Sequence, residues 1–188
     1  MSNRKTALLV MDLQNGIISR LEENSKEVLL PFQKAIKAAR EHSISVIFVR
    51  VGFSKGYPEI SPKNKAFSAI SKYGAMTVND EATQIDESVL PEANEPVITK
   101  YRVSAFSGSN LETILRAQQI ETLILSGIST SGVVLSTLRE AADKDFEIKV
   151  LNDACFDSDP EVHRILMEKV FPRQADVLNV QAWIDLLH

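Results

Sequence analysis

Two charged residues, Asp12 and Lys100, each close a short apolar run and are the first candidates for chemistry. Asp12 directly follows the run at residues 7–11, and Lys100 ends the run at 96–100. A carboxyl group above apolar residues is partly desolvated, which favours its protonated form, whereas a nearby ammonium favours the carboxylate. An aspartate held between these influences suits a general acid or base. Taken alone, Asp12 could equally cap a turn, and a lysine at a strand end is commonly solvated.

A third stretch, residues 123–140, has the pattern of a strand, a turn and a helix. An apolar run breaks at Gly127, and a turn rich in hydroxyl residues leads to Gly132. Apolar residues then recur at helical spacing: Val134, Leu138 and Ala141. The first N–H groups of such a helix lack intrahelical partners and can hold an anion or a polarised oxygen. If the three stretches end neighbouring parallel strands, they meet at one crevice.

The whole chain alternates between β-prone apolar runs and helix-length segments. The predicted strands are residues 7–11, 45–51, 96–100, 121–125, 147–151 and 176–180. Pro31 is expected at the first position of a helix, Ser109 and Glu112 are expected to form a capping box, and another helix is expected to start at 159–160. Strands separated by helices imply right-handed crossovers and a parallel sheet covered on both faces. The sequence predicts one three-layer α/β domain spanning residues 1–188.

Two further segments carry predictions about the helices and the pocket. Residues 130–144 are expected to form the helix after the fourth strand. The long segment 52–92 contains prolines at 58, 62 and 91 and a predicted helical piece near 65–70. A long irregular segment in a compact domain is typically a pocket wall or a lid.

The bulk composition argues against several classes of partner and cofactor. The chain has 188 residues, 24% of them charged, and a net charge of −4, so neither nucleic acid nor a membrane surface is expected as a partner. The scattered histidines and the lack of a glycine-rich phosphate loop predict no metal and no cofactor. Cys155 is the single cysteine, and the apolar run near the N-terminus is too short for a signal peptide or a membrane span. A cytoplasmic location is therefore expected.

Taken in this order and spacing, the motifs resemble those of the isochorismatase-like hydrolases, also known as the cysteine hydrolase superfamily, over nearly the whole chain. The motifs are Val-Met-Asp-Leu-Gln-Asn at 10–15, Thr-Lys-Tyr-Arg-Val-Ser-Ala-Phe at 99–106, Leu-Glu-Thr-Ile-Leu-Arg at 111–116, Gly-Ile-Ser-Thr-Ser-Gly-Val-Val at 127–134 with Thr137, and Asp-Ala-Cys at 153–155. The resemblance implies a six-stranded parallel sheet in the order 3-2-1-4-5-6. It also implies an Asp, a Lys and a Cys at the ends of strands one, three and four.

The first two of these positions match Asp12 and Lys100, but the cysteine position falls on Val133. Amidase members of the superfamily are understood to form an acyl-enzyme through the thiolate, and valine has no lone pair to do so. Isochorismatase itself also lacks the cysteine and is thought to need only an acid, a cation and a water. The metal-binding Asp-x-His motif of the nicotinamidase branch is replaced here by residues 50–55, so membership of that branch is not expected.

The resemblance also implies a backbone cradle and a set of substrate contacts. A non-proline cis peptide is expected at Ile128–Ser129, which would place the N–H groups of Ser129 and Val133 side by side as an oxyanion hole. From their positions just beyond strand ends, five side chains are predicted to line the substrate pocket, although each aromatic could equally be a wall or core residue. They are Gln14, Phe53, Tyr57, Arg102 and Phe106. Several basic residues suggest an anionic ligand: Lys55, Lys63, Lys65 and Arg102.

Three functions follow from these patterns. The first is a hydrolase without a covalent intermediate, acting on a small carboxylate-bearing molecule with Asp12 as general acid or base, Lys100 orienting it and water attacking. The second is a catalytically silent member that binds a small molecule or a protein through the same pocket. The third is thiol catalysis by Cys155, although a lone cysteine is commonly a small core residue. Hydroxyls at 129–131 are alternative nucleophiles that lack a histidine base in the nearby sequence.

Members of this superfamily commonly form dimers or larger assemblies. A homo-oligomer is therefore expected here, and segment 52–92 is a plausible contact between its subunits.

Overall fold

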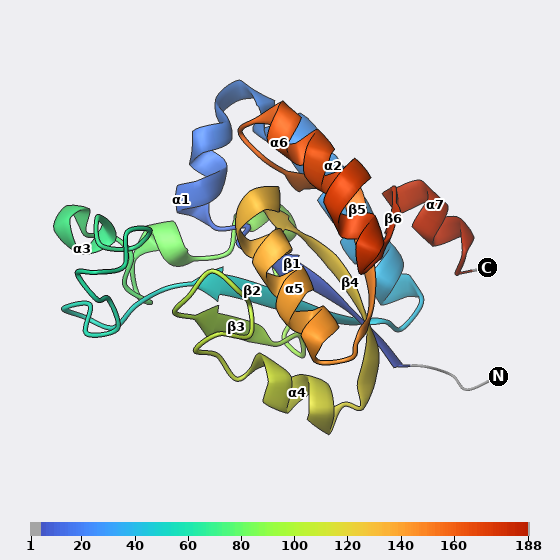
Figure 1. Ribbon diagram of the computed structural model, residues 1–188, viewed down its shortest axis with the longest axis horizontal. Coiled ribbons are helices and arrows are strands. Elements are labelled where there is room, and N and C mark those ends of the chain that lie inside the picture. The colour runs from blue at the N-terminus through green and yellow to red at the C-terminus, as the bar shows by residue number, and fades with distance from the viewer. Residues whose placement is uncertain (1–4, 188) are drawn as a thin grey trace.

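The computed structural model describes residues 5–187, without the side chains of residues 22–24 and 73. Six strands form one parallel sheet in the order β3-β2-β1-β4-β5-β6 (Figure 1), which confirms the predicted topology. The strands are β1 (Lys5–Met11), β2 (Ser45–Val51), β3 (Val97–Lys100), β4 (Ile120–Ile128), β5 (Glu147–Phe156) and β6 (Asp176–Leu178). The order reverses between β1 and β4, and ligands of open parallel sheets bind beyond the carboxyl ends of the strands at such a point.

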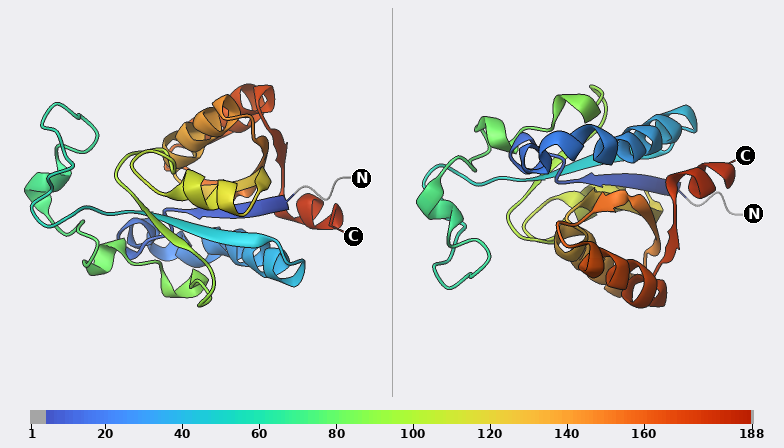
Figure 2. Two further views of the ribbon diagram at one scale, coloured as in Figure 1. Left: turned by 90° about the horizontal axis from the view of Figure 1, so that it is seen from below. Right: turned by 90° about the horizontal axis from the view of Figure 1, so that it is seen from above.

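Helices cover both faces of this sheet. They are α1 (Asn15–Ile18), α2 (Ser25–Glu41), α3 (Ile70–Tyr73), α4 (Leu111–Ala117), α5 (Leu135–Asp143), α6 (Pro160–Ile165) and α7 (Val180–Asp185). Short 3-10 turns occur at η1 (Ser19–Asn24), η2 (Glu81–Thr83), η3 (Glu87–Val89) and η6 (Phe171–Arg173), and π-helical turns at η4 (Thr130–Val134) and η5 (Leu166–Val170). Figure 2 shows α2 on one face of the sheet and α4, α5 and α6 on the other. Among residues 5–187, no helix is both long and apolar enough to span a bilayer.

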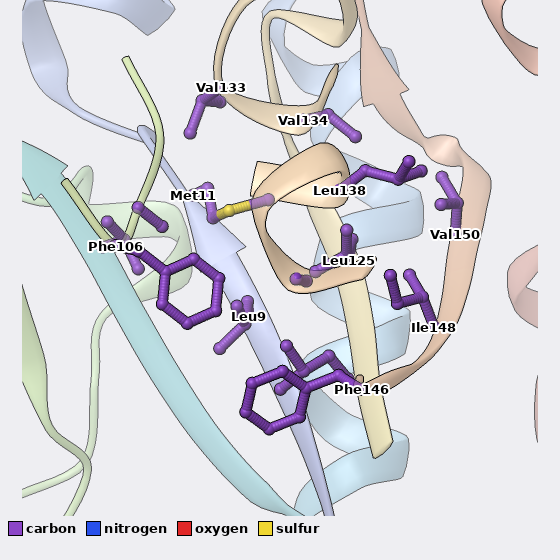
Figure 3. Packing of buried hydrophobic residues seen from close by; sticks show 14 of the residues in the cluster. Leu9, Met11, Phe106, Leu125, Val133, Val134, Leu138, Phe146, Ile148 and Val150 are labelled. Atoms are coloured by element: carbon purple, nitrogen blue, oxygen red, sulfur yellow. The ribbon is translucent and has the colours of Figure 1, made fainter. Parts of the chain in front are cut away.

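The apolar runs of β1, β2 and β4 are buried on both sides, as parallel strands between two helical layers should be, whereas the edge strands β3 and β6 are partly exposed. Alternate residues of β1 serve the two layers: Leu9 and Met11 pack with α4 and α5, whereas Leu8 and Val10 pack with α2 and α7. Figure 3 shows the first of these layers, with the helix that follows β4 lying over the strands. Burying apolar area at about 25 cal/mol per Å² is the main force that stabilises such layers.

The prediction that Pro31 begins a helix is wrong, since α2 begins at Ser25 and contains Pro31 in its interior. Proline there removes one N–H from the helical ladder, at a typical cost of about 3 kcal/mol. Upstream of it, however, Leu29 is buried and Val28 is partly buried against the same layer. The apolar face therefore extends across the proline, and burial outweighs the lost hydrogen bond.

Local hydrogen bonds account for the other differences at helix ends. Helix α4 begins at Leu111, whose N–H donates to Ser109 Oγ (3.2 Å), but Glu112 pairs with Lys144 (2.7 Å) and does not close the predicted capping box. The predicted cap at Asp159 is confirmed by its bonds from the N–H groups of residues 161 and 162.

Other element boundaries also move, and β4 and β5 continue to Ile128 and Phe156, beyond their predicted ends at 125 and 151. Strand β6 stops at Leu178 because the Asn179 side chain caps α7. Helix α3 begins at Ile70, where the predicted helical piece near 65–70 ends. The helix expected at 130–144 opens with a π-helical turn before α5 begins at Leu135.

The long segment 52–92 extends beyond the carboxyl ends of the strands and carries α3 away from the body of the molecule (Figure 1). It is joined to β3 at Gly52, whose N–H donates to Lys100 O (3.3 Å), and the Phe53 N–H donates to Met76 O (2.9 Å) within the segment. Packing of the Phe53 ring against Phe67, with centroids 5.7 Å apart, holds the base of this segment. One of its side chains, Phe67, returns to the sheet edge and enters the site described next.

Candidate active site

The two charged residues singled out in the sequence form a buried ion pair. Lys100 Nζ lies 3.0 Å from Asp12 Oδ2, and the two residues are only 2% and 6% exposed. Asp12 follows β1, while Lys100 ends β3 in register with Val51 on the intervening strand β2. The lysine side chain therefore crosses the end of β2 to reach the aspartate, a distance that a four-carbon chain can span.

Backbone geometry aims the aspartate at this point. Asp12 has φ of 62°, in the left-handed region that Asp tolerates better than most residues, and its N–H donates to Val49 O (2.8 Å). Lys100 Nζ also donates to Arg102 O (3.0 Å), so the ammonium is fixed from two directions. An aspartate in the left-handed backbone region costs free energy and persists only where its surroundings hold it in place. Such residues cluster at functional sites.

The two carboxylate oxygens of Asp12 differ in their environment. Oδ2 accepts from Lys100, whereas Oδ1 is buried and has no hydrogen-bond partner among the described residues. Burial raises the pKa of Asp12 above its usual value of 3.8, and the charge and hydrogen bond of Lys100 only partly oppose this. Since Oδ2 already accepts a hydrogen bond from Lys100, Oδ1 is the oxygen that can take up a proton.

The turn after β4 forms the opposite wall. It contains a cis peptide at Ile128–Ser129, as the resemblance implied. A Cβ on Gly127 would lie 2.8 Å from Met11 O, so glycine is required where β4 passes β1. Ser129 O accepts from the N–H groups of residues 132 and 134, at 3.2 and 3.3 Å. This compact turn brings Ser129 and Val133 to the cavity wall.

Asp157 and His163 support the turn from behind. Asp157 Oδ2 accepts from the Ser131 N–H (2.7 Å), and His163 Nδ1 lies 2.8 Å from Thr130 Oγ1. Burial acts to raise the pKa of Asp157, but hydrogen bonds from Ser131 and from the Asp159 N–H outweigh it and hold that pKa below its usual value. Burial also lowers the pKa of His163, and the charge of Asp157 only partly opposes this shift.

Sequence reasoning missed this support because His163 lies 33 residues from Thr130. The predicted helix start at Asp159 was the available signal, since it places His163 one helical turn further along. The histidine does not turn Thr130 into a supported nucleophile, because Thr130 is fully buried and is not among the residues that line the cavity.

These elements enclose a cavity of about 640 Å³, within the size range of small-molecule sites. Its charged lining residues, among those described, are Asp12, Arg20 and Lys100. The remaining wall is apolar or carries small polar groups. It consists of Ile17, Leu21, Val51, Phe67, Val103, Ile128, Ser129, Gly132, Val133, Phe156 and Ser158.

The structure brings together four of the predicted site residues at this cavity: Asp12, Lys100, Ser129 and Val133. The five predicted substrate contacts are not among its lining residues. Gln14 is fully buried, and its side-chain amide both donates to Val51 O and accepts from the Val51 N–H (2.8 Å each). That amide is already engaged in joining the end of β1 to β2.

The three aromatic residues predicted as substrate contacts lie outside the cavity lining. Phe53 is fully buried behind Phe67, and the Tyr57 hydroxyl accepts from the Met76 N–H (3.3 Å) in the long segment. Phe106 lies in the core between β1 and Phe146, as Figure 3 shows, with the two rings 6.1 Å apart. These three aromatic residues follow the ends of β2 and β3, and their side chains pack outside the cavity lining.

The basic residues proposed to attract an anion are also absent from the lining of the cavity. The Arg102 guanidinium donates to Tyr101 O (2.6 Å), and only the backbone of Arg102 reaches Lys100. The three lysines of the long segment, Lys55, Lys63 and Lys65, do not line the cavity either.

Arg20 is the cation that sequence reasoning missed. With Ile17 and Leu21 it forms an i, i+3, i+4 set after Asp12, which was a readable signal.

The thiol of Cys155 does not belong to this site. Cys155 is 6% exposed and packs in the same core layer as Leu125, with Sγ 4.0 Å from Leu125 O, and it is not among the cavity-lining residues. Burial raises the pKa of this thiol far above its ordinary value. A neutral, buried thiol away from the cavity is a core residue, and the third hypothesis is not supported.

Comparison with known proteins assigns the chain to a family. The isochorismatase domain model matches residues 6–182, and the chain belongs to the isochorismatase family of hydrolases. The uncharacterized isochorismatase family protein YecD of Escherichia coli O157:H7 is 31% identical over 186 residues, covering 98% of this chain and 97% of that protein. The ureidoacrylate amidohydrolase RutB of Stutzerimonas stutzeri is 30% identical over 205 residues, covering 97% and 79%.

Solved structures show the same fold at lower identity. An isochorismatase family protein from Desulfovibrio vulgaris has a TM-score of 0.87 and 21% identity, covering 98% of this chain and 99% of that one. An N-carbamoylsarcosine amidase from Thermoplasma acidophilum has a TM-score of 0.74 and 24% identity, covering 94% and 96%. The strand order 3-2-1-4-5-6 is thus the fold of this family.

Proposed function

We propose that this protein hydrolyses a small, carboxylate-bearing molecule by acid–base catalysis, with water as the attacking group and no covalent thioester. The observation that carries the proposal is the buried Asp12–Lys100 pair, 3.0 Å apart, on the wall of a cavity large enough for a small molecule. Val133 lies on the same wall and offers no lone pair, so the proposal takes water as the nucleophile. Ureidoacrylate, named for the RutB relatives, is itself a small carboxylate and is consistent with this substrate class.

In the proposed reaction Asp12 carries one proton from water to the leaving group. As the water oxygen bonds to the electrophilic carbon, the Asp12 carboxylate takes a proton from that water. As the bond between that carbon and the leaving group breaks, Asp12 returns the proton to the leaving group and regains its starting state. Lys100 keeps Oδ2 occupied, so Oδ1 exchanges the proton. Proton transfer of this kind typically contributes about 10²–10⁴-fold in rate.

The turn after β4 has a place in the same scheme. Negative charge develops on the oxygen of the attacked carbon, and donors preorganised toward that oxygen lower the barrier. The backbone N–H groups of Ser129 and Val133 are the proposed donors, since both residues line the cavity. The valine side chain limits the space beside them and favours a substrate with a slim reacting end.

A catalytically silent binding protein is the second candidate, and the near-complete burial of Val133 (2% exposed) favours it, because this side chain fills the nucleophile position. The experiment is a hydrolysis screen of small carboxylate-bearing amides, ureas and enol ethers with wild type and Asp12→Asn. Asp143→Asn, at an exposed position away from the cavity, is the matched control.

We expect turnover by wild type and by the control, and a loss of about 10²–10⁴-fold in Asp12→Asn, since asparagine cannot carry the proton. Turnover that survives in Asp12→Asn would exclude the proposed mechanism. Ligands that bind to wild type without any turnover would identify the silent alternative.

A further inference from the structure

A third charged group faces the cavity, and neither the mechanism nor the family comparison uses it. Arg20 lies in η1, the 3-10 turn that follows α1, and lines the cavity together with Ile17 and Leu21. Ile17 and Leu21 also pack against the core layer of α2, so they hold this short segment on the sheet. The guanidinium is thus presented from a segment whose apolar residues are anchored.

The charge of Arg20 is not compensated by the described protein. Asp12 and Lys100 neutralise each other, and no described carboxylate forms an ion pair with Arg20. Other arginines of the chain do have such partners: Arg40 with Glu95, Arg116 with Glu112, and Arg164 with Glu161. Among the side chains that the structure describes at this cavity, Arg20 is therefore the charged group without an oppositely charged partner.

Most of the remaining wall is apolar, contributed by aliphatic and aromatic side chains from α1, β2, β4 and β5 and from loops that include the long segment. Phe67 and Phe156 are its aromatic members, and Ser158 adds one hydroxyl beyond β5. An apolar wall with a single free cation selects ligands that have an apolar body and one anionic group. The guanidinium presents its donors in a fork that matches the two oxygens of a carboxylate.

Lys100 is a poor alternative for binding this anion. Its ammonium already donates to Arg102 O and to Asp12, and it is only 2% exposed. A second carboxylate drawn to it would lie beside the carboxylate of Asp12, and the two negative charges would repel each other. Substrate charge is better placed away from the proton-transfer pair.

We propose that Arg20 determines specificity by binding the carboxylate of the substrate, and that the site takes small monocarboxylates with an apolar body. This inference rests on the proposed function, because it takes the same cavity as the substrate site. It replaces Lys55, Lys63, Lys65 and Arg102 as the source of anion binding. The carboxylate lies on Arg20, the apolar body fills the cavity, and the reacting carbon points to Asp12.

The test is a binding comparison with benzoate and its neutral isostere benzamide, measured by calorimetry on the full chain at low ionic strength. Wild type is compared with Arg20→Gln, Arg20→Lys and the control Arg173→Gln, which is exposed and outside the cavity. We expect wild type and the control to bind benzoate about tenfold or more tightly than benzamide. Arg20→Gln should lose this preference, and Arg20→Lys should keep part of it because the charge remains but the fork does not.

Equal binding of the two probes to wild type, no binding of benzoate to wild type, or an undiminished preference in Arg20→Gln would each overturn the proposal. Asp12→Asn separates this inference from the catalytic one. It should lose turnover while retaining the preference for benzoate. Retained turnover in that variant would defeat the proposed mechanism and leave the binding result intact.

Discussion

Two aspartates flank the cavity, and the fold prepares them for opposite tasks. Asp12 and Asp157 are similarly buried, at 6% and 8% exposed. Asp12 has one oxygen without a partner among the described residues, and burial raises its pKa. Asp157 accepts from the Ser131 and Asp159 N–H groups, and these bonds lower its pKa. The Asp12 carboxyl group lies deeper among other protein atoms and has fewer donors than that of Asp157, and both differences favour a higher pKa for Asp12.

The largest expected effect comes from removing the cation beside Asp12. Lys100→Met leaves a buried carboxylate unpaired, which typically costs about 3–5 kcal/mol of stability. We expect this loss in urea unfolding at pH 7, and a smaller loss at acidic pH, where Asp12 is protonated. The control Lys149→Met breaks the more exposed pair with Asp176 and should cost about 0–1 kcal/mol. An unchanged urea midpoint in Lys100→Met would show that the pair does not stabilise the fold.

The second effect is on the pH dependence of turnover. As a base, Asp12 must be deprotonated, so kcat/KM should rise with pH through a pKa above 3.8 and fall about tenfold per pH unit below it. Asp157→Asn should keep the same inflection, because Asp157 does not exchange protons with substrate. Circular dichroism at each pH confirms that the enzyme stays folded. A rate that instead falls as pH rises through this pKa would make Asp12 the initial acid and reverse the order of its two proton transfers.

A smaller effect, on folding stability, is expected from replacing Asp157, whose carboxylate accepts two backbone hydrogen bonds. Its lowered pKa means that Asp157 contributes stability above its usual pKa near 3.8, and that this contribution is lost as pH falls through the lowered value. Asp157→Asn should therefore cost about 1–2 kcal/mol at pH 7, and the difference from wild type should shrink in strong acid. Chemical denaturation at both pH values measures it, with Asp143→Asn as the control. A cost that stays the same across this range would exclude the charge of Asp157 as its cause.

The smallest effect is expected on the pH dependence of folding stability when His163 is replaced. Because its pKa in the folded protein lies below 6.5, the unfolded chain binds a proton more readily than the folded chain in that window. Wild-type stability should thus decline as pH falls from 7 toward the lowered pKa. His163→Gln should remove that part of the slope at a cost of about 1 kcal/mol or less. Identical slopes for the two proteins would show that the imidazole does not titrate with unfolding.

Much of the fold followed from local pattern. Apolar runs such as 7–11 can only be strands buried on both faces, and their alternation with helices leaves few topologies. The errors arose where a distant contact decided the outcome. Pro31 stays inside α2 because residues upstream of it find an apolar surface on the sheet, and Glu112 leaves the capping box for Lys144.

In the site, too, some features follow from local sequence and others from contacts between distant segments. The residue types at 12, 100 and 133 determined that an acid and a cation stand at strand ends and an aliphatic group in the turn after β4, because strand position and side-chain chemistry are encoded locally. Only the tertiary structure decided which side chains face the cavity. Arg20 replaces Arg102 there, and His163 comes to support Thr130, because packing between distant segments sets the direction in which each side chain points.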